Sequence, residues 1–289
     1  MKKSLALLIA LGMMASMSAC GSGETASTAS SAAESAVSEV SAAESAVSEA
    51  SAAESAAGEE TAELATVNAG KLTMSTNAAF PPYEMTTDSG DFEGIDVEIA
   101  GAIAEKLGLE LQVDDMDFDA ALLAAQQGKS DIVMAGVSVT EERQKVMEFS
   151  TSYATGVQVV IVKEGSEIAS VDDLEGKMIG TQRGTTGSIY CSDDYGDENI
   201  TMYDNGLTAV QALNNGQVDC VVIDSEPAKK FVEANPGLVI LDTEYVSEDY
   251  AIGMAKGNTA LLDAVNAAIE ELQADGTIDG IIAKYINAE

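Results

Sequence analysis

The chain has 289 residues, enough for two ordinary domains, and its 14 Lys and Arg residues against 49 Asp and Glu residues give a formal net charge of −35. A charge this negative argues against nucleic acid and anionic lipid surfaces as partners. The sequence contains no histidine, which removes Ser-His-Asp and Cys-His nucleophile schemes and histidine-rich zinc sites. The composition therefore predicts no nucleic-acid partner, no metal and no cofactor.

Residues 1–20 have the order of a bacterial export signal. Lys2 and Lys3 precede an apolar run over residues 5–17 that is too short to span a bilayer, and Ser18, Ala19 and Cys20 follow. A cysteine directly after two small residues resembles the lipobox of bacterial lipoproteins, although Met stands at position 17 where Leu is usual. We expect a lipoprotein signal peptide over 1–20 with Cys20 as the lipidated residue; an ordinary secretory signal with a chance cysteine is the alternative.

Residues 21–67 have the composition of a spacer. Three ten-residue repeats, SAAESAVSEV, SAAESAVSEA and SAAESAAGEE, fill residues 31–60, and residues 21–65 contain no aromatic residue, Lys or Arg. Such a segment cannot bury enough apolar surface to fold alone. We therefore interpret 21–67 as a low-complexity linker that holds the folded part away from a membrane.

The pattern that follows is strand, helix, strand, helix, strand. We expect strands at 71–76, 109–113 and 132–134, and helices at 95–107 and 117–128. This order predicts a parallel sheet with right-handed crossovers. The third strand ends in Ala135 and Gly136, followed by Ser138 and then Arg143. Ligands bind at this carboxyl edge in open α/β sheets, and an arginine supplies a planar fork for a carboxylate.

A second α/β unit occupies the rest of the chain. Its predicted features are a strand at 157–162, a capping box at 170–173, a strand at 178–180, a Gly/Thr loop, strands at 200–203, 220–223 and 239–241, a helix at 207–213, a crossing segment at 250–255, and helices at 260–272 and 278–285. Cys191 and Cys220 match no metal-binding spacing. An exported protein permits a disulfide between them, while the apolar run around Cys220 suggests a buried thiol, and the sequence leaves both open.

Four motifs, GDFEGIDVEIAGAIAEKLG, DIVMAGVSVTEER, GTTGS and DGTIDGIIAKY, resemble the bacterial extracellular solute-binding proteins of family 3 from about residue 68 to the C-terminus. Members of that family are amino-acid receptors of ABC importers. The resemblance implies an α/β, two-lobed periplasmic-binding-protein (type II) fold with two hinge crossings. It places lobe 1 at 68–158 with 250–289 and lobe 2 at 159–249, with the crossings at 157–162 and 250–255.

The resemblance also implies a role for each candidate site residue. Arg143, with Ser138 and Thr186, would hold the ligand's carboxylate. Asp224 and the Gly136 carbonyl would hold its ammonium, and the rings of Phe80 and Phe118 would enclose its side chain. Asn77 is the eighth predicted ligand-binding residue and stands where several relatives carry Asp for basic or amide ligands.

Each of these residues also has a purely structural interpretation. Arg143 could be a surface residue paired with Glu141 or Glu142, and Asp224 could cap the helix that follows it. The other arginine of the chain, Arg183, could face solvent or point at the part of the site that would hold the ligand's side chain.

The uncharged candidates have structural alternatives too. Phe80 and Phe118 could be core residues. Ser138 and Thr186 could be turn and cap residues.

The sequence thus predicts an extracytoplasmic, lipid-anchored receptor, not an enzyme, that captures a polar amino acid between two lobes and delivers it to ABC permease subunits in the membrane. The alternatives are an enzyme of this fold that dehydrates a cyclic carboxylate, and a sensor-type ligand-binding domain. Asn77 in place of Asp, with Ile223 beside Asp224, favours a neutral polar ligand. Aromatic walls would equally suit a flat guanidinium, and the negative charge favours cations.

Overall fold

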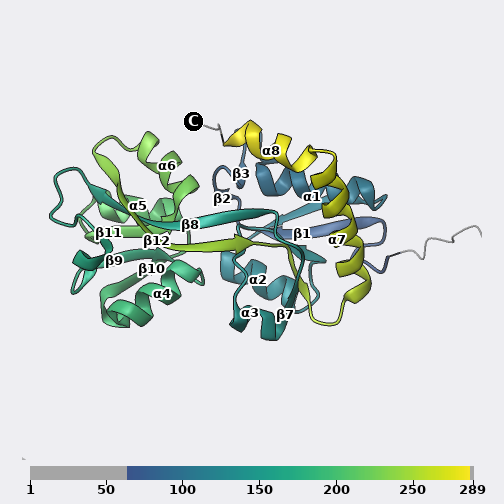
Figure 1. The fold of residues 1–289 in the computed structure, drawn as a ribbon, viewed down its shortest axis with the longest axis horizontal. Helices are drawn as coiled ribbons and strands as arrows, with labels where there is room; N and C mark the ends of the chain where they lie inside the picture. Colours follow the sequence, from purple (N-terminus) through teal and green to yellow (C-terminus); the bar gives the residue numbers. More distant parts are fainter. Residues whose placement is uncertain (1–63, 287–289) are drawn as a thin grey trace, which may run out of the picture. The chain divides into compact units, whose positions relative to one another are not determined.

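The computed structural model describes residues 64–286. The predicted signal peptide, Cys20 and the linker up to residue 63 lie outside the described residues. The described part is one compact unit that contains two five-stranded sheets and one three-stranded sheet. We name the two parts built on the larger sheets the first lobe and the second lobe (Figure 1).

The sheet of the first lobe has the strand order β5-β1-β6-β13-β7. Strand β1 (Lys71–Thr76) pairs in parallel with β5 (Glu110–Asp115) and with β6 (Ile132–Val133). Strand β13 (Gly253–Ala255) is antiparallel to both β6 and β7 (Met147–Phe149). The predicted parallel arrangement is therefore confirmed for the first three strands, and the sheet becomes mixed where the chain returns from the second lobe.

Helices cover both faces of this sheet. Helix α1 (Ile95–Lys106) packs against α7 (Thr259–Ala274) and α8 (Thr277–Tyr285), while α2 (Phe118–Gln126) contacts β1, β6 and β13. Figure 1 shows α2 on the other side of the sheet from α1. Side chains alternate across a strand, so the apolar run that contains β6 must be covered twice.

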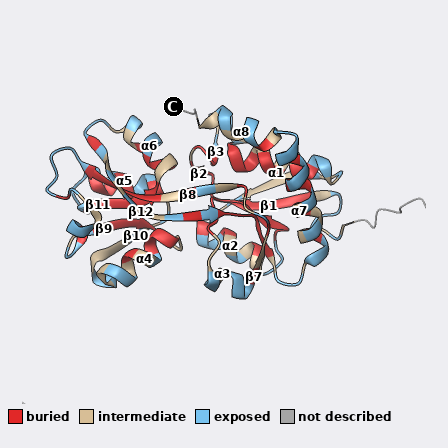
Figure 2. Ribbon diagram, in the orientation of Figure 1, coloured by how far each residue is buried: buried red, intermediate tan, exposed pale blue. Residues whose placement is uncertain are grey.

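The side chains of this run divide between two hydrophobic clusters. Ile132 and Met134 belong to the cluster that contains α1 and α7 residues. Val133 and Ala135 belong to the cluster of Phe118 on α2. The run lies in the buried interior that Figure 2 shows in red, as its sequence predicts.

The sheet of the second lobe has the order β10-β9-β11-β8-β12. Strand β9 (Ile179–Gln182) is parallel to β10 (Ile200–Tyr203) and to β11 (Cys220–Asp224). Strand β8 (Ala154–Lys163) is antiparallel to β11 and to β12 (Leu238–Tyr250). The strand predicted at 239–241 is wrong in length, because β12 has 13 residues. Its polar alternation and two register shifts hide it from a search for apolar runs.

Three helices complete this lobe, of which the sequence predicted one in full. Helix α5 (Gly206–Asn214) was expected, and so was the capping box, which begins the 3-10 helix η1 (Val171–Leu174). The Gly/Thr loop instead leads directly into helix α4 (Thr186–Tyr195), and α6 (Ser225–Ala234) follows β11. A further 3-10 turn, η2 (Asp197–Asn199), precedes β10.

Strands β8 and β12 join the two lobes. Their antiparallel ladder runs from Lys163 opposite Leu238 to Ala154 opposite Tyr250, and Tyr250 also forms a bridge to Ser138 of the first lobe. Two crossing strands are therefore confirmed. The segment 157–162 pairs inside the second sheet and 253–255 inside the first, and the chain passes between the lobes at the paired ends of β8 and β12, where Tyr250 begins the predicted segment 250–255.

A three-stranded sheet of β2 (Ala79–Phe80), β3 (Glu84–Thr86) and β4 (Phe92–Glu93) precedes α1. The chain can approach itself here only because residue 94 is glycine. Its φ is +131°, and a Cβ atom on it would lie 2.2 Å from the Tyr83 carbonyl oxygen. This packing draws β3 under α1 and buries Glu84.

The core answers the question that the sequence left open about the two cysteines. Cys191 and Cys220 are both free and buried, in one hydrophobic cluster, so the buried-thiol interpretation is confirmed over the disulfide. Within residues 64–286, we find no helix with the length and apolar character that a membrane crossing needs.

Candidate functional site

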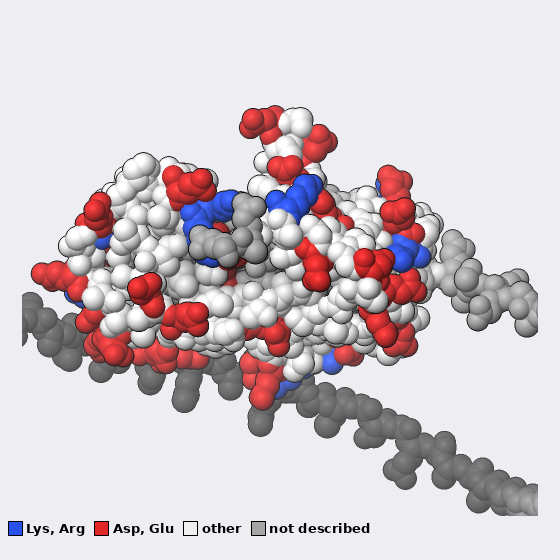
Figure 3. Space-filling model, turned by 45° about the horizontal axis from the view of Figure 1, so that its top comes forward, with Lys and Arg blue, Asp and Glu red and all other residues white. Residues whose placement is uncertain are grey.

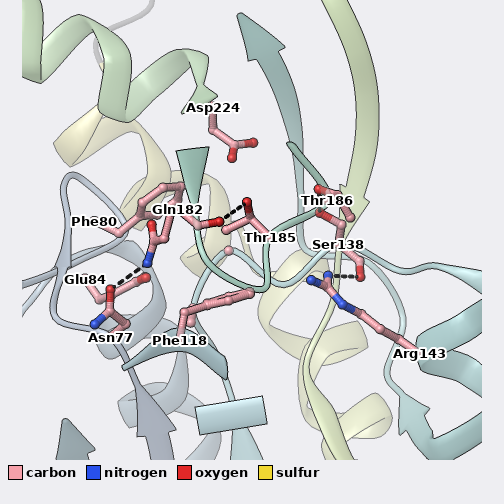
Figure 4. Close-up of a pocket in the computed structure, with 12 residues that line it drawn as sticks. Asn77, Phe80, Glu84, Phe118, Ser138, Arg143, Gln182, Thr185, Thr186 and Asp224 are labelled. Carbon is pink, nitrogen blue, oxygen red and sulfur yellow. Dashed lines mark hydrogen bonds between the residues drawn. The ribbon is translucent and has the colours of Figure 1, made fainter. Parts of the chain in front are cut away.

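A small cavity is lined by residues of both lobes (Figure 4). The first lobe contributes the segment from the end of β1 to the start of β3, the start of α2, the residues after β6 and helix α3 (Glu141–Val146). The second lobe contributes the ends of β9 and β11 and the start of α4. All eight candidate residues of the sequence line it, together with four that the sequence did not indicate. The lining is Asn77, Phe80, Glu84, Phe118, Ala135, Gly136, Ser138, Arg143, Gln182, Thr185, Thr186 and Asp224.

Arg143 lies at one end of the cavity. Its Nη1 donates to the Ser138 carbonyl at 2.8 Å, and its Nη2 donates to the Gly184 carbonyl of the second lobe at 3.1 Å. Its guanidinium lies 5.5 Å from the centre of the Phe118 ring. Within the described residues Arg143 forms no ion pair, so the surface-pair interpretation with Glu141 or Glu142 is wrong.

The environment of Arg143 favours an incoming anion. Burial lowers the pKa of Arg143, and the nearby Glu248 carboxylate opposes that shift. Two neutral carbonyls hold the fork in place without neutralising its charge. A buried charge without a counter-ion is unfavourable, and a ligand carboxylate would supply one in bidentate geometry.

The hydroxyl groups beside Arg143 are held by a residue that sequence reasoning missed. Glu248 on β12 accepts from Thr186 Oγ1 at 2.6 Å, from Ser138 Oγ at 3.2 Å and from the Tyr190 hydroxyl at 2.9 Å. This carboxylate fixes hydroxyls from both lobes at the crossing. The only signal in the sequence was the alternation of polar and apolar residues along β12, which can be recognised only once the strand is known.

Thr186 has a second role as the first residue of α4. The helix is capped by Thr185, whose hydroxyl accepts from the Ser188 N–H. The first N–H groups of a helix have no intrahelical partner, and the helix dipole favours negative charge there. The start of α4 therefore adds backbone donors beside the Arg143 guanidinium. The cap role predicted for Thr186 is wrong, because Thr185 caps the helix and the Thr186 hydroxyl donates to Glu248.

Asp224 lies at the end of β11 and is buried. Gln158 Nε2 donates to it at 2.9 Å, and the Tyr250 hydroxyl donates to its other oxygen. Burial, opposed by the hydrogen bonds from Tyr250 and Gln158 and assisted by the Glu248 charge, raises the pKa of Asp224 to about 6. Although Asp224 occupies the N-cap position of α6, its side chain makes no cap bond, so the cap interpretation does not account for it.

The opposite end of the cavity is formed by amides and a carboxyl group. Asn77 Nδ2 donates to the Met116 carbonyl at 2.9 Å, and Asn77 Oδ1 accepts from Gln182 Nε2 at 3.0 Å. Glu84 has 0% exposure. Burial first, and then the charge of Asp96 and a hydrogen bond between the two carboxyl groups, raise the pKa of Glu84 well above its usual range. Figure 4 shows this group well separated from Arg143.

The two aromatic candidates are both core residues and part of the cavity wall. Phe80 and Phe118 are buried members of hydrophobic clusters and also line the cavity. Arg183, by contrast, is not part of the lining. Its side chain is half exposed and lies 3.8 Å from Asp204, which confirms the solvent-facing alternative.

No group of three or more Cys, Asp and Glu side chains between residues 64 and 286 is arranged to hold a metal ion. The functional groups that line the cavity are a guanidinium, buried carboxyl groups, side-chain amides and aromatic rings. These groups can bind a small zwitterion.

The family model for bacterial extracellular solute-binding proteins, family 3, matches residues 72–288. The chain therefore belongs to this family. It is 31% identical to the L-cystine-binding protein TcyJ of Escherichia coli (strain K12) over 76% of this chain and 84% of that protein.

Solved structures agree with this assignment. An ancestral arginine-binding protein bound to glutamine is 39% identical, with a TM-score of 0.72, over 76% of this chain and 99% of that one. The substrate-binding protein AbpA of Streptococcus pneumoniae, bound to L-arginine, is 36% identical with a TM-score of 0.71 over 75% and 94%. The two-lobed α/β fold predicted from the sequence is thus confirmed, and the relatives are amino-acid-binding proteins.

Proposed function

We propose that this chain is the substrate-binding receptor of an amino-acid ABC importer, which captures a polar amino acid between its lobes and delivers it to permease subunits in the membrane. A lipid on Cys20 would anchor it on the outer side of that membrane. One observation carries the proposal: the same cavity is lined by Arg143, which forms no ion pair within residues 64–286, and, apart from it, by the buried carboxyl group of Asp224.

The two charged groups match the two ends of an α-amino acid. Arg143, with Ser138 and the start of α4, would bind the carboxylate. Asp224, with the Gly136 carbonyl, would bind the ammonium, because a buried ion needs a partner of opposite charge.

The site is divided between the lobes, which explains how capture works. Arg143 and Ser138 belong to the first lobe, and Thr186 and Asp224 belong to the second. A ligand that contacts all of them favours the closed arrangement over an open one, because an open site provides only half of the contacts. Bending at the paired ends of β8 and β12 would open the cavity, a motion of microseconds to milliseconds.

The test is calorimetric titration of ligand-stripped protein with each common amino acid and with cystine. We expect one chemical group of amino acids to bind, and binding to fall by about 30-fold or more in Arg143→Ala and in Asp224→Ala, since each leaves a buried charge unpaired. Arg183→Ala is the matched control, because the exposed Arg183 lies outside the cavity.

The outcomes separate a receptor from the other classes. Recovery of the ligand unchanged after prolonged incubation is expected for a receptor, whereas its conversion would indicate an enzyme. No binding by any amino acid would refute the proposal, as would equal losses in Arg143→Ala and the Arg183→Ala control.

A further inference from the structure

The carboxylate of Glu248 lies beside the Arg143 end of the cavity without lining it. It is on β12, where the chain crosses between the lobes, and it is buried. Its Oε2 accepts from the Thr186 hydroxyl at 2.6 Å and from the Ser138 hydroxyl at 3.2 Å, and its Oε1 accepts from the Tyr190 hydroxyl at 2.9 Å. All three donors are neutral groups, and two of them come from residues that line the cavity.

These hydroxyl groups can serve only one carboxylate at a time. A Ser or Thr hydroxyl has a single proton to donate. The contact of 2.6 Å commits the Thr186 proton to Glu248, and Ser138 Oγ lies between Glu248 at 3.2 Å and Thr186 Oγ1 at 3.4 Å. A second carboxylate that reaches this end of the cavity therefore meets hydroxyls of both lobes that are already engaged.

The charge of Arg143 is shared in the same way. Figure 4 shows Arg143 grouped with Ser138 and Thr186 at one end of the cavity. Burial lowers the pKa of Arg143, and Glu248 contributes most among the charges that oppose this shift. Part of the attraction that Arg143 would exert on a ligand's carboxylate is therefore already balanced by Glu248. Two carboxylates that share one cation also repel each other.

We propose that Glu248 is an internal competitor of the ligand's carboxylate, which engages the hydroxyls and balances the positive charge that this carboxylate would use. This inference rests on the proposed function, because it assumes that Arg143 binds the carboxylate of an amino acid. A receptor that delivers its ligand to a permease must release it, and affinity differences between related complexes lie mostly in the dissociation rate. Glu248 thus weakens the hold on the carboxylate and shortens the lifetime of the complex.

A purely structural role for Glu248 makes a different prediction. Its hydrogen bonds tie the crossing strand β12 to α4 and to Ser138, so its loss could loosen the closed site as a whole. Affinity would then fall for any ligand, whether or not it carries a carboxylate. The α-amide of an amino acid separates the two roles, because it keeps the ammonium and the side chain and replaces the carboxylate by a neutral group of similar size.

The experiment is calorimetric titration of ligand-stripped protein with the common L-amino acids and with the α-amide of each one that binds. Loss of one partner of a buried charge pair weakens binding by ~30-fold to ~4,000-fold. For the wild-type protein we expect the acid to bind more tightly than its amide by no more than about 100-fold, since Glu248 already balances part of the charge of Arg143. A larger ratio would overturn the inference, because Arg143 would then be fully available to the ligand.

Glu248→Gln removes the charge and keeps the shape. We expect the acid-to-amide ratio of affinities to rise by about tenfold through tighter binding of the acid, while the affinity of the amide stays within about threefold of wild type. A chase of bound, labelled amino acid should show dissociation slowed by a similar factor.

The control must separate this local effect from a change in net charge. Figure 3 shows acidic side chains spread over the outer surface, so the loss of any one of them alters the overall potential. Glu244→Gln is the matched control, because Glu244 is an exposed glutamate on the same strand. We expect the wild-type acid-to-amide ratio in this variant.

An unchanged or lower acid-to-amide ratio in Glu248→Gln would overturn the inference and leave the receptor proposal standing. An equal loss of affinity for acid and amide would assign Glu248 the structural role and also overturn it. The wild-type ratio tests the inference even if Glu248→Gln does not fold. No binding of any amino acid to the wild-type protein would overturn both proposals.

Discussion

Asp224→Asn should stabilise the ligand-free protein while it weakens ligand binding. The pKa of Asp224 is raised from 3.8 to about 6 by burial. The folded protein therefore binds this proton more tightly than the unfolded chain does. The contribution to stability is fully present below about pH 4 and is lost as the pH rises through about 6. At pH 8 the ionised group is unfavourable by about 3 kcal/mol, at ~1.4 kcal/mol per pKa unit.

This value already contains the hydrogen bonds that the Tyr250 hydroxyl and Gln158 Nε2 donate to the carboxylate, because they lower the pKa of Asp224. The expected gain at pH 8 is therefore about 3 kcal/mol. For a folded unit of this size that corresponds to a rise in Tm of about 6–12 °C.

The assay is thermal unfolding of ligand-stripped protein at pH 8 and pH 4.5, with Asp263→Asn as the control because Asp263 is an exposed aspartate on α7. The difference between Asp224→Asn and wild type should be largest at pH 8 and nearly vanish at pH 4.5. An equal difference at both pH values, or a destabilised variant at pH 8, would refute the reasoning, since the carboxylate would then be a net stabilising group.

Three further predictions concern the crossing, the thiols and the anchor. Gly156→Ala places a Cβ atom 2.3 Å from the ring of Tyr250. The overpacking should lower the free energy of unfolding by about 1–3 kcal/mol, measured by urea titration. An unchanged urea midpoint would contradict this contact. Burial raises the pKa of both Cys191 and Cys220 to about 12. A thiol reagent should therefore label them only after unfolding, and rapid labelling of the native protein would show that they are accessible. Cys20→Ser should move the exported protein from the detergent-rich to the aqueous phase in detergent partitioning, and retention in the detergent phase would exclude the lipid anchor.

Local patterns were sufficient for much of the fold. The strand at Lys71–Thr76 and the helices α1 and α5 follow from apolar periodicity and from caps that neighbouring residues supply. The doubly buried run at β6 reads as continuously apolar because two different clusters cover its two faces.

The carboxyl groups that the sequence missed are buried by contacts that local patterns do not reveal. Glu248 is one of many acidic residues until β12 pairs with β8 and brings it to Ser138 and Thr186, which are far away in sequence. Glu84 is buried by packing against the nearby helix α1, which Gly94 permits. A periodicity search detects neither residue.

The paired crossing strands limit how one lobe can move relative to the other. A ladder that runs the length of β8 and β12 cannot slide by one residue without breaking its hydrogen bonds and turning every side chain to the other face. Translation along the strands is therefore blocked, and bending or twisting of the two-stranded ribbon remains. Because so few motions remain, ligand occupancy of the cavity and the angle between the two lobes should change together. A pair of dyes placed on the two lobes would report that angle, which makes the fold a natural frame for an optical sensor.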